Sequence, residues 1–365
     1  MVSQPINDFN PDYASPPGKM LEEILDSRAI KKTDFAQRCG LSPKHISQII
    51  HDKASISPET AIQLERVLGI SAAIWSNLDA NYRLFNAKKE ARAKLQWQAN
   101  WTRKFPLSQL VEREIIPPII DDADSVQKLL RFFSVATVDA WEDRFKRLSV
   151  AYRGSMSFQR APESVAAWLR IGEITAEGIE TEPYDKGKFI PALQMIRSLT
   201  KENPKKFEPL MREHCKQAGV ALVFVSELPK TRLCGATRWL SSEKALIMLS
   251  LRYHWEDIFW FTFFHEAAHI LKHGKTDCFL DDENNEEKKS TEQEIEADRF
   301  AADFLIPPSE YKIFLQKGVF GKDSIKTFAR HLGIAPGIVV GRLQHDKRID
   351  HSWHNDLRRR FKIAS

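Results

Sequence analysis

The chain has 365 residues, which is more than one typical domain needs and predicts two or three domains. Hydrophobic residues make up 42% and charged residues 28%, values of an ordinary globular protein that exclude a disordered or fibrous chain. The net charge of +5 is modest, so its distribution matters more than its size. The longest apolar run near the middle, Ile258 to Phe264, is far shorter than the roughly 20 residues of a membrane span.

The N-terminus and the cysteines indicate the compartment. The first residues lack a basic start followed by an apolar core, so no secretory signal is predicted. The cysteines Cys39, Cys215, Cys234 and Cys278 are far apart and form no CxxC pair, which argues against a disulfide framework and a cysteine-rich metal site. We therefore expect a cytoplasmic protein with reduced thiols and no membrane partner.

Residues 17–85 are predicted to form a packed set of short helices. Apolar residues at helical spacing begin at Leu21, and Gly40 allows the left-handed turn that ends a second helix. Ser42 and Pro43 then start a third helix, because serine caps helix N-termini and proline fits the first helical position. Helix, glycine turn and helix form a helix-turn-helix arrangement.

The third helix of this arrangement is expected to turn Ile46 and Ile49 inward. The residues expected to face outward and to contact DNA are Lys44, His45, Gln48 and Lys53. The run from Thr33 to Leu84 resembles the HigA-like branch of Xre-type DNA-binding domains, and this resemblance implies double-stranded DNA as a partner. The alternative is that the same helices serve as a protein docking module.

Residues 86–188 are predicted to be a helical linker region. A long helix beginning near Ser71 continues into a charged segment, and Pro106 and Pro117-Pro118 interrupt the helical pattern. Apolar residues at helical spacing then predict amphipathic helices up to about residue 185. No chemistry is predicted for this region.

Residues 189–310 combine helices with strand-like runs. Two helices precede the runs VALVFVS and ALIMLSL, which are predicted to be strands. The longest buried element follows, the helix EDIFWFTFFHEAAHILKHG, with Gly274 as its expected C-terminal cap. After an acidic loop, a further helix EQEIEADRFAADFLI is predicted to end at Pro307-Pro308.

An HExxH motif, formed by His265, Glu266 and His269, lies in the longest predicted helix. One helical turn separates the histidines, so both imidazoles leave the same face and can share one ion. Zinc prefers such nitrogen ligands in tetrahedral geometry, and a hydrolytic site keeps one position for water. Glu266 can take the proton of this water, while the metal lowers the water's pKa and polarises the scissile carbonyl. The alternatives are two buried histidines or a structural zinc pair.

A third metal ligand is expected on the following helix. Glu294 and Asp298 stand in ExxxD spacing, so Glu294 can reach the zinc while Asp298 orients a ligand histidine. Glu296 points roughly 200° around the helix from Glu294, so only one of the two glutamates can face the metal. Glu294 is favoured because Asp298 is on its face. His273 is expected about 6 Å farther along the first helix, near its end or in the cleft.

The stretch from about 190 to 310 resembles the ImmA/IrrE family of metallo-endopeptidases in the segments HEAAHILKHG, EIEADRFAADFLIPP and RYHWEDIFWFTFF. The resemblance implies a zincin-like fold in which Zn2+ is bound by His265, His269 and Glu294, with Glu266 as the base. Characterised members of that family cut a helix-turn-helix repressor, which implies a protein substrate of this kind. Two features depart from the family, the fused helix-turn-helix and the helical segment that follows it.

Residues 311–365 are predicted to be a helical basic segment. From Lys326 to Lys362 there are nine Lys or Arg residues against three Asp, with three arginines in succession at Arg358–Arg360. This excess indicates either a nucleic-acid surface or a solvated basic tail. A helix-turn-helix-like phrase around Gly333 is expected to pack against the preceding domain, with a second DNA reader as the alternative.

The chain as a whole is predicted to be α+β and mostly helical, with an all-α N-terminal domain and a small β-sheet in the zincin-like domain. The leading functional expectation is a zinc-dependent regulatory endopeptidase that cuts a transcriptional repressor. The alternative is a DNA-binding, antitoxin-like regulator whose peptidase domain acts as a sensor. A small-peptide hydrolase would need an amine anchor, and none is recognisable. A homodimer is left open, and the candidates for oxyanion stabilisation are Tyr253, His254, His273 and Arg238.

Overall fold

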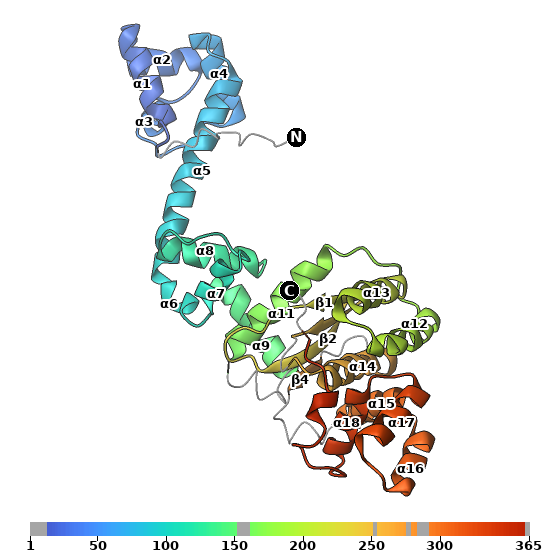
Figure 1. Ribbon diagram of the computed structural model, residues 1–365. Helices are drawn as coiled ribbons and strands as arrows, with labels where there is room; N and C mark the ends of the chain where they lie inside the picture. Colours follow the sequence, from blue (N-terminus) through green and yellow to red (C-terminus); the bar gives the residue numbers. More distant parts are fainter. Residues whose placement is uncertain (1–12, 152–160, 251–253, 275–278, 283–291, 362–365) are drawn as a thin grey trace. The chain divides into compact units, whose positions relative to one another are not determined.

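A computed structural model describes residues 13–151, 161–250, 254–274, 279–282 and 292–361 (Figure 1). The chain divides into two compact units. One comprises the chain up to Ala99 together with Asp121–Asp124, and the other comprises Asn100–Ile120 and the chain from Ser125 onward. The elements are mostly helical with one small sheet, which confirms the predicted fold class. The domain boundaries drawn after residues 85, 188 and 310 remain predictions. Within the described ranges, no helix combines the length and apolarity that crossing a membrane requires.

The N-terminal unit is a group of helices around one apolar core. Its helices are α1 (Pro17–Ser27), α2 (Lys32–Cys39), α3 (Pro43–Ile50), α4 (Pro58–Leu68) and α5 (Ala72–Trp97). Phe35, Ile46, Leu64 and Trp75 bring one fully buried side chain each from α2, α3, α4 and α5 into this core. The apolar spacing seen in the sequence therefore packs as expected.

Two local signals produce the turn between α2 and α3. Gly40 ends α2 with a φ of 69°, a left-handed conformation that glycine adopts without a steric penalty. The Ser42 side chain accepts a hydrogen bond of 3.1 Å from the amide of His45 and so caps α3. The predicted helix-turn-helix arrangement follows directly from these residues.

From Ala99 onward the chain is also largely helical. The helices are α6 (Ala99–Thr102), α7 (Leu107–Glu112), α8 (Asp122–Phe132), α9 (Val138–Ala151), α11 (Pro162–Glu177), α12 (Lys186–Ser198), η1 (Leu199–Lys201), α13 (Pro204–Gln217), α14 (Glu256–Lys272), α15 (Glu292–Leu305), α16 (Pro308–Lys317), α17 (Lys322–Leu332), α18 (Pro336–His345) and η3 (Asn355–Leu357). Edge-to-face contacts of Trp101 with Phe105 and Trp141, at centroid distances of 5.0 and 5.4 Å, hold the first of these helices together.

The sheet is mixed and has the strand order β1-β3-β2-β4 in the described residues. Its strands are β1 (Val220–Phe224), β2 (Leu233–Ser241), β3 (Lys244–Leu249) and β4 (Phe279–Asp282). β1 pairs with β3 in parallel, and β2 pairs antiparallel with both β3 and β4. Only β1 and β3 were predicted. β2 begins with a Leu-Cys-Gly-Ala run of weak strand propensity, and β4 is very short.

Helix α14 covers one face of this sheet. Leu222 of β1 and Ile247 of β3 are register partners and share a core with Phe263 and Phe264 of α14. The next residue of β3, Met248, points to the opposite face, where its side chain lies against α11. On its other side α14 packs against α15 and α18, which lie beside it in Figure 1. These contacts on several sides explain why α14 is apolar nearly all round.

The C-terminal segment folds back onto the start of α14. Arg358 makes two hydrogen bonds of 2.8 Å to the carboxylate of Asp257, and Arg359 pairs with Glu256 at 2.5 Å. Both acidic residues belong to the first turn of α14. Arg358 and Arg359 therefore serve the fold as ion-pair partners. For these arginines the placement differs from both sequence interpretations of the basic segment, a nucleic-acid surface and a solvated tail. The sequence did not reveal the ion pairs because the acidic partners are about 100 residues away in the chain.

Loss of the Arg358–Asp257 pair is expected to be costly. The two side chains are only 12% and 11% exposed, so Arg358→Ala leaves a buried carboxylate without its partner. We expect the free energy of unfolding to fall by about 3–5 kcal/mol, measured by urea denaturation followed by circular dichroism. Lys322→Ala is the control, since it removes an exposed pair with Asp356 and should cost about 1 kcal/mol or less. Equal losses in the two variants would contradict the expectation.

Candidate metal centre

Three buried side chains from two helices meet next to the sheet. His265 and His269 come from α14, and Glu294 comes from the first turn of α15. The Nε2 atoms of the histidines are 3.0 Å apart, and Glu294 Oε2 is 3.2 Å from the first and 3.8 Å from the second. The three residues are 4%, 1% and 9% exposed. Their donor atoms thus converge on one point inside the protein.

The spacing of these donors fits a tetrahedrally bound ion. Metal–ligand distances of about 2.0–2.1 Å place two tetrahedral donors roughly 3.3 Å apart, a value within the observed range of separations. Burial lowers the pKa of His269 to about 4, so its imidazole is neutral near pH 7 and has a lone pair to offer. Two imidazole nitrogens and one carboxylate oxygen are also the ligand set of hydrolytic zinc sites. The residues therefore fit a divalent metal such as zinc.

The packing of α14 against α15 brings Glu294 to the histidines. Ala297 and Ala301 of α15 are completely buried, and their small side chains allow the two helices to approach closely. Glu294 lies one turn before Ala297 and so points from the same face of α15 toward α14. The two alanines of α15 thus let Glu294 come close enough to the histidines of α14 to act as the third donor.

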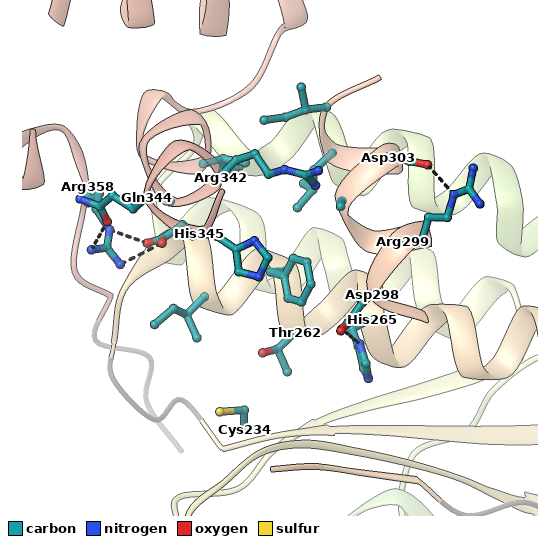
Figure 2. Close-up of a pocket in the computed structure, with 18 of the residues that line it drawn as sticks. Cys234, Thr262, His265, Asp298, Arg299, Asp303, Arg342, Gln344, His345 and Arg358 are labelled. Atoms are coloured by element: carbon teal, nitrogen blue, oxygen red, sulfur yellow. Dashed lines mark hydrogen bonds and ion pairs between the residues drawn. The ribbon is translucent and has the colours of Figure 1, made fainter. Parts of the chain in front are cut away.

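Asp298 lies directly behind His265 (Figure 2). Its Oδ1 is 2.9 Å from His265 Nδ1, and it stands one helical turn beyond Glu294 on α15. A carboxylate in this position accepts the proton of Nδ1, which leaves the Nε2 lone pair directed toward Glu294 and His269. The geometry thus gives His265 the tautomer that a metal ligand needs.

Glu266, next to His265 on α14, packs against strand β2. It is completely buried, and Thr237 Oγ1 donates a hydrogen bond of 2.5 Å to Glu266 Oε2. Gly235 lies two residues earlier on the same face of β2, where an added Cβ would come within 2.6 Å of Glu266 Oε1. The close approach of β2 to α14 therefore requires glycine at this position. Sequence reasoning missed Thr237 because it missed the strand that carries it.

His273 and Glu296 lie on the far side of His269. His273 follows α14 in an extended conformation, with φ −107° and ψ 167°, and its Nδ1 is 2.8 Å from His269 Nδ1. Its Nε2 is 3.3 Å from Glu296 Oε2, and Lys272 Nζ is 2.7 Å from Glu296 Oε1. The donation from Lys272 lowers the pKa of Glu296. The structure thus directs Glu294, and not Glu296, to the histidine pair, and His273, rather than Gly274, caps α14.

The other residues considered for oxyanion stabilisation have different surroundings. Arg238 forms an ion pair with Glu173 of α11 and is largely buried there. His254 has a φ of 57°, and its carbonyl accepts a hydrogen bond of 2.6 Å from the amide of Phe361. Tyr253 is outside the described residues. Neither Arg238 nor His254 is brought to the three-residue cluster.

A cavity of about 750 Å³ opens next to the cluster, between α14, α15 and α18 (Figure 2). His265 and Glu294 form part of its wall. Its apolar lining comes from Ile258, Phe261, Leu305, Ile306 and Ile338. The volume lies in the range of small-ligand sites, so the cavity can hold a ligand of the size of an amino-acid side chain or larger.

The outer face of α3 in the N-terminal unit is polar. Lys44 is exposed on α3 and Lys53 is exposed just beyond it, whereas His45 and Gln48 are partly buried. Ile46 and Ile49 are buried in the core, as the sequence predicted. Both lysines are therefore accessible to a ligand of opposite charge.

Two family models match the chain. A helix-turn-helix model matches residues 21–75, and a peptidase-family model described as the IrrE N-terminal-like domain matches residues 230–344. The first range contains α2 and α3, and the second contains the three-residue cluster together with Thr237. Both expected resemblances are confirmed.

Two curated proteins resemble the N-terminal part. An uncharacterized HTH-type transcriptional regulator of Escherichia coli, YddM, is 34% identical over 73 residues, which are 20% of this chain and 78% of that protein. Virulence-associated protein I of Dichelobacter nodosus is 30% identical over 78 residues, which are 21% of this chain and 72% of that protein.

One similar solved structure is an addiction module antidote protein of the HigA family from Coxiella burnetii, with 24% sequence identity. The match covers 22% of this chain and 89% of that chain, with a TM-score of 0.21. A Pseudomonas aeruginosa protein in complex with its operator DNA has 30% identity, covers 20% of this chain and 82% of its own, and has a TM-score of 0.20. The family models and the curated relatives, in contrast, show that the chain belongs to the helix-turn-helix family through its N-terminal part and carries an IrrE N-terminal-like peptidase-family domain in its C-terminal part.

Proposed function

We propose that this chain is a zinc-dependent endopeptidase that hydrolyses a peptide bond of a partner protein. The observation that carries the proposal is the buried convergence of His265, His269 and Glu294 beside a cavity, with Glu266 on the same helix. The peptidase-family match over residues 230–344 supports the same chemistry. His265, His269 and Glu294 would hold the zinc, which supplies Lewis acidity and a water of lowered pKa.

Glu266 is the proposed general base. Its carboxylate would take a proton from the attacking water and pass it to the amine that leaves, so that one group serves both proton transfers. The hydrogen bond from Thr237 holds the orientation of this carboxylate. Asp298 keeps His265 in the ligand tautomer. The cavity excludes bulk water from one side and receives a substrate side chain.

The proposed substrate is a helix-turn-helix transcriptional repressor in the cytoplasm. The fusion of a helix-turn-helix part to a peptidase-family part supports this choice, since the first part offers a way to reach an operator or a repressor of similar fold. The alternative, an antitoxin-like regulator whose second domain only senses a signal, is less favoured. A sensor has no need for a buried carboxylate such as Glu266 next to a histidine pair.

The test is to incubate the purified protein with regulators encoded beside its own gene, with zinc and after chelation of zinc. We expect cleavage of one regulator at a discrete site, lost on chelation and restored by zinc. Gel electrophoresis and mass spectrometry of the fragments measure this cleavage. Survival of every candidate in the zinc-loaded sample would argue against the endopeptidase and for the sensor.

We also propose that the N-terminal unit binds duplex DNA. The exposed lysines Lys44 on α3 and Lys53 just beyond it support this proposal. Lys44→Ala is expected to weaken binding to all sequences and to lower the salt dependence by about one unit of slope, because a phosphate contact is lost. Gln48→Ala is expected to relax preference at one base pair by about 1–3 kcal/mol.

Both effects are measured as DNA affinities, by fluorescence anisotropy titrations of the full chain with DNA from upstream of its own gene at two salt concentrations. Lys19→Ala on α1 is the charge-matched control, since Lys19 is also exposed. The protein-docking alternative predicts no salt-dependent affinity for DNA at all, and that result would favour it. A palindromic footprint with half-sites one helical turn apart would support the homodimer that the sequence leaves open.

A further inference from the structure

The two histidines of the cluster differ in what lies behind them. His265 Nδ1 faces a carboxylate directly, at 2.9 Å from Asp298. His269 Nδ1 instead faces another imidazole nitrogen, Nδ1 of His273, at 2.8 Å. The carboxylate on this side, Glu296, stands beyond that imidazole, with Oε2 at 3.3 Å from His273 Nε2. An imidazole is thus inserted between His269 Nδ1 and the carboxylate of Glu296.

We propose that His273 and Glu296 are positioning residues that hold His269 in the tautomer and ring orientation needed to bind the metal. The proposal rests on the proposed function, because it concerns the same metal centre. It adds two residues to the site, and neither of them touches the ion. Nothing in the sequence pattern of the HExxH motif itself requires them.

The direction of each hydrogen bond follows from the ligand role of His269. A metal at Nε2 needs the lone pair of that atom, so the proton of the neutral ring must be on Nδ1. This Nδ1–H donates, and His273 Nδ1 must therefore accept. The ring proton of His273 is then on Nε2, where it donates to Glu296 Oε2. His269, His273 and Glu296 thus form a row of hydrogen bonds in which each ring nitrogen has one role. The row ends on the carboxylate of Glu296.

Burial makes this row effective. The His273 side chain is 4% exposed, so water does not compete for its contact with His269. Glu296 is 46% exposed, and its second oxygen accepts from Lys272 Nζ at 2.7 Å. The carboxylate end of the row therefore lies at the surface, while the imidazole of His273 lies buried against His269.

The same geometry excludes two other roles for His273. Its contact is with Nδ1 of His269, on the side of the ring away from the Nε2 atom that faces His265. His273 is therefore not placed as a further ligand of the ion between those Nε2 atoms. For the same reason it does not reach the oxyanion of a substrate bound there, although the sequence left that role open.

The experiment uses the full chain and measures its zinc affinity by competition with a chromophoric chelator. His273→Ala is expected to weaken zinc binding by about 10–100-fold, the usual effect of removing an orienting partner. His273→Asn should recover most of this loss, because an Asn Oδ1 can accept from His269 Nδ1. Glu296→Ala should show a smaller loss, and Glu292→Ala is its control, an exposed glutamate two positions before Glu294 rather than two after it.

Absorption spectra of the Co2+-substituted variants provide a second readout, since the visible bands report ligand geometry independently of activity. A changed spectrum in His273→Ala and a restored one in His273→Asn would support the proposal. Wild-type zinc affinity and an unchanged spectrum in a folded His273→Ala variant would overturn it while leaving the proposed function intact. Absence of zinc binding in the wild-type chain would overturn both.

Discussion

Glu266→Gln is expected to retain zinc and to lose about 10²–10⁴-fold in the rate of substrate cleavage, because only the proton acceptor is removed. The glutamine is nearly isosteric, and its carbonyl oxygen can still accept the hydrogen bond that Thr237 donates to Glu266. The fold of α14 and the positions of both histidines should therefore be unchanged. Zinc content by mass spectrometry and cleavage of the identified regulator give the two numbers.

A companion variant separates the base from its support. Thr237→Val keeps the size of the side chain and the carboxylate of Glu266 but removes the hydrogen bond between them. We expect a smaller loss of rate than in Glu266→Gln and no loss of zinc. If Glu266→Gln cleaves at the wild-type rate, Glu266 is not the base and the mechanism proposed above is wrong.

His265→Ala and Glu294→Ala are expected to lose the metal. Each removes one of three donors whose separations, 3.0 to 3.8 Å, fit a single ion, so about one zinc per wild-type chain should fall to a small fraction after dialysis. Glu296→Ala should keep most of its zinc, because Glu296 meets Lys272 and His273 instead of the donor cluster.

The comparison of the two glutamates is the sharper part of this experiment. Both are acidic residues of α15, two positions apart, so a purely electrostatic effect on the cation would make them similar. Equal retention of zinc in Glu294→Ala and Glu296→Ala, measured by elemental analysis after the same dialysis, would therefore contradict the assignment of Glu294 as a ligand.

Local sequence determines the parts of this protein that depend on neighbours along the chain. His265 and His269 share a face because a helical turn is about 3.6 residues, and Glu294 and Asp298 share one for the same reason. Gly40 and the Ser42 cap likewise produce the turn before α3 from residues within a few positions of each other. These features were predictable because their physical causes act over one or two turns.

The tertiary structure decides the contacts between segments distant in sequence. Thr237 reaches Glu266 only because β2 pairs with β3 and passes across α14, and the sequence of β2 does not announce a strand. Arg358 meets Asp257 across 101 positions of the chain. Such pairings depend on how whole elements pack, and period and propensity carry no information about it.

His273 shows the same division within a few residues. Helical spacing places it one turn beyond His269 and suggests a residue farther along the cleft, but α14 ends at Lys272 and the backbone becomes extended. The imidazole then turns back onto His269 and meets Glu296 from α15. The sequence by itself determined which residues can bind a metal, whereas only the tertiary structure decided what lies behind each of them, because helix ends and the facing helix are set by packing.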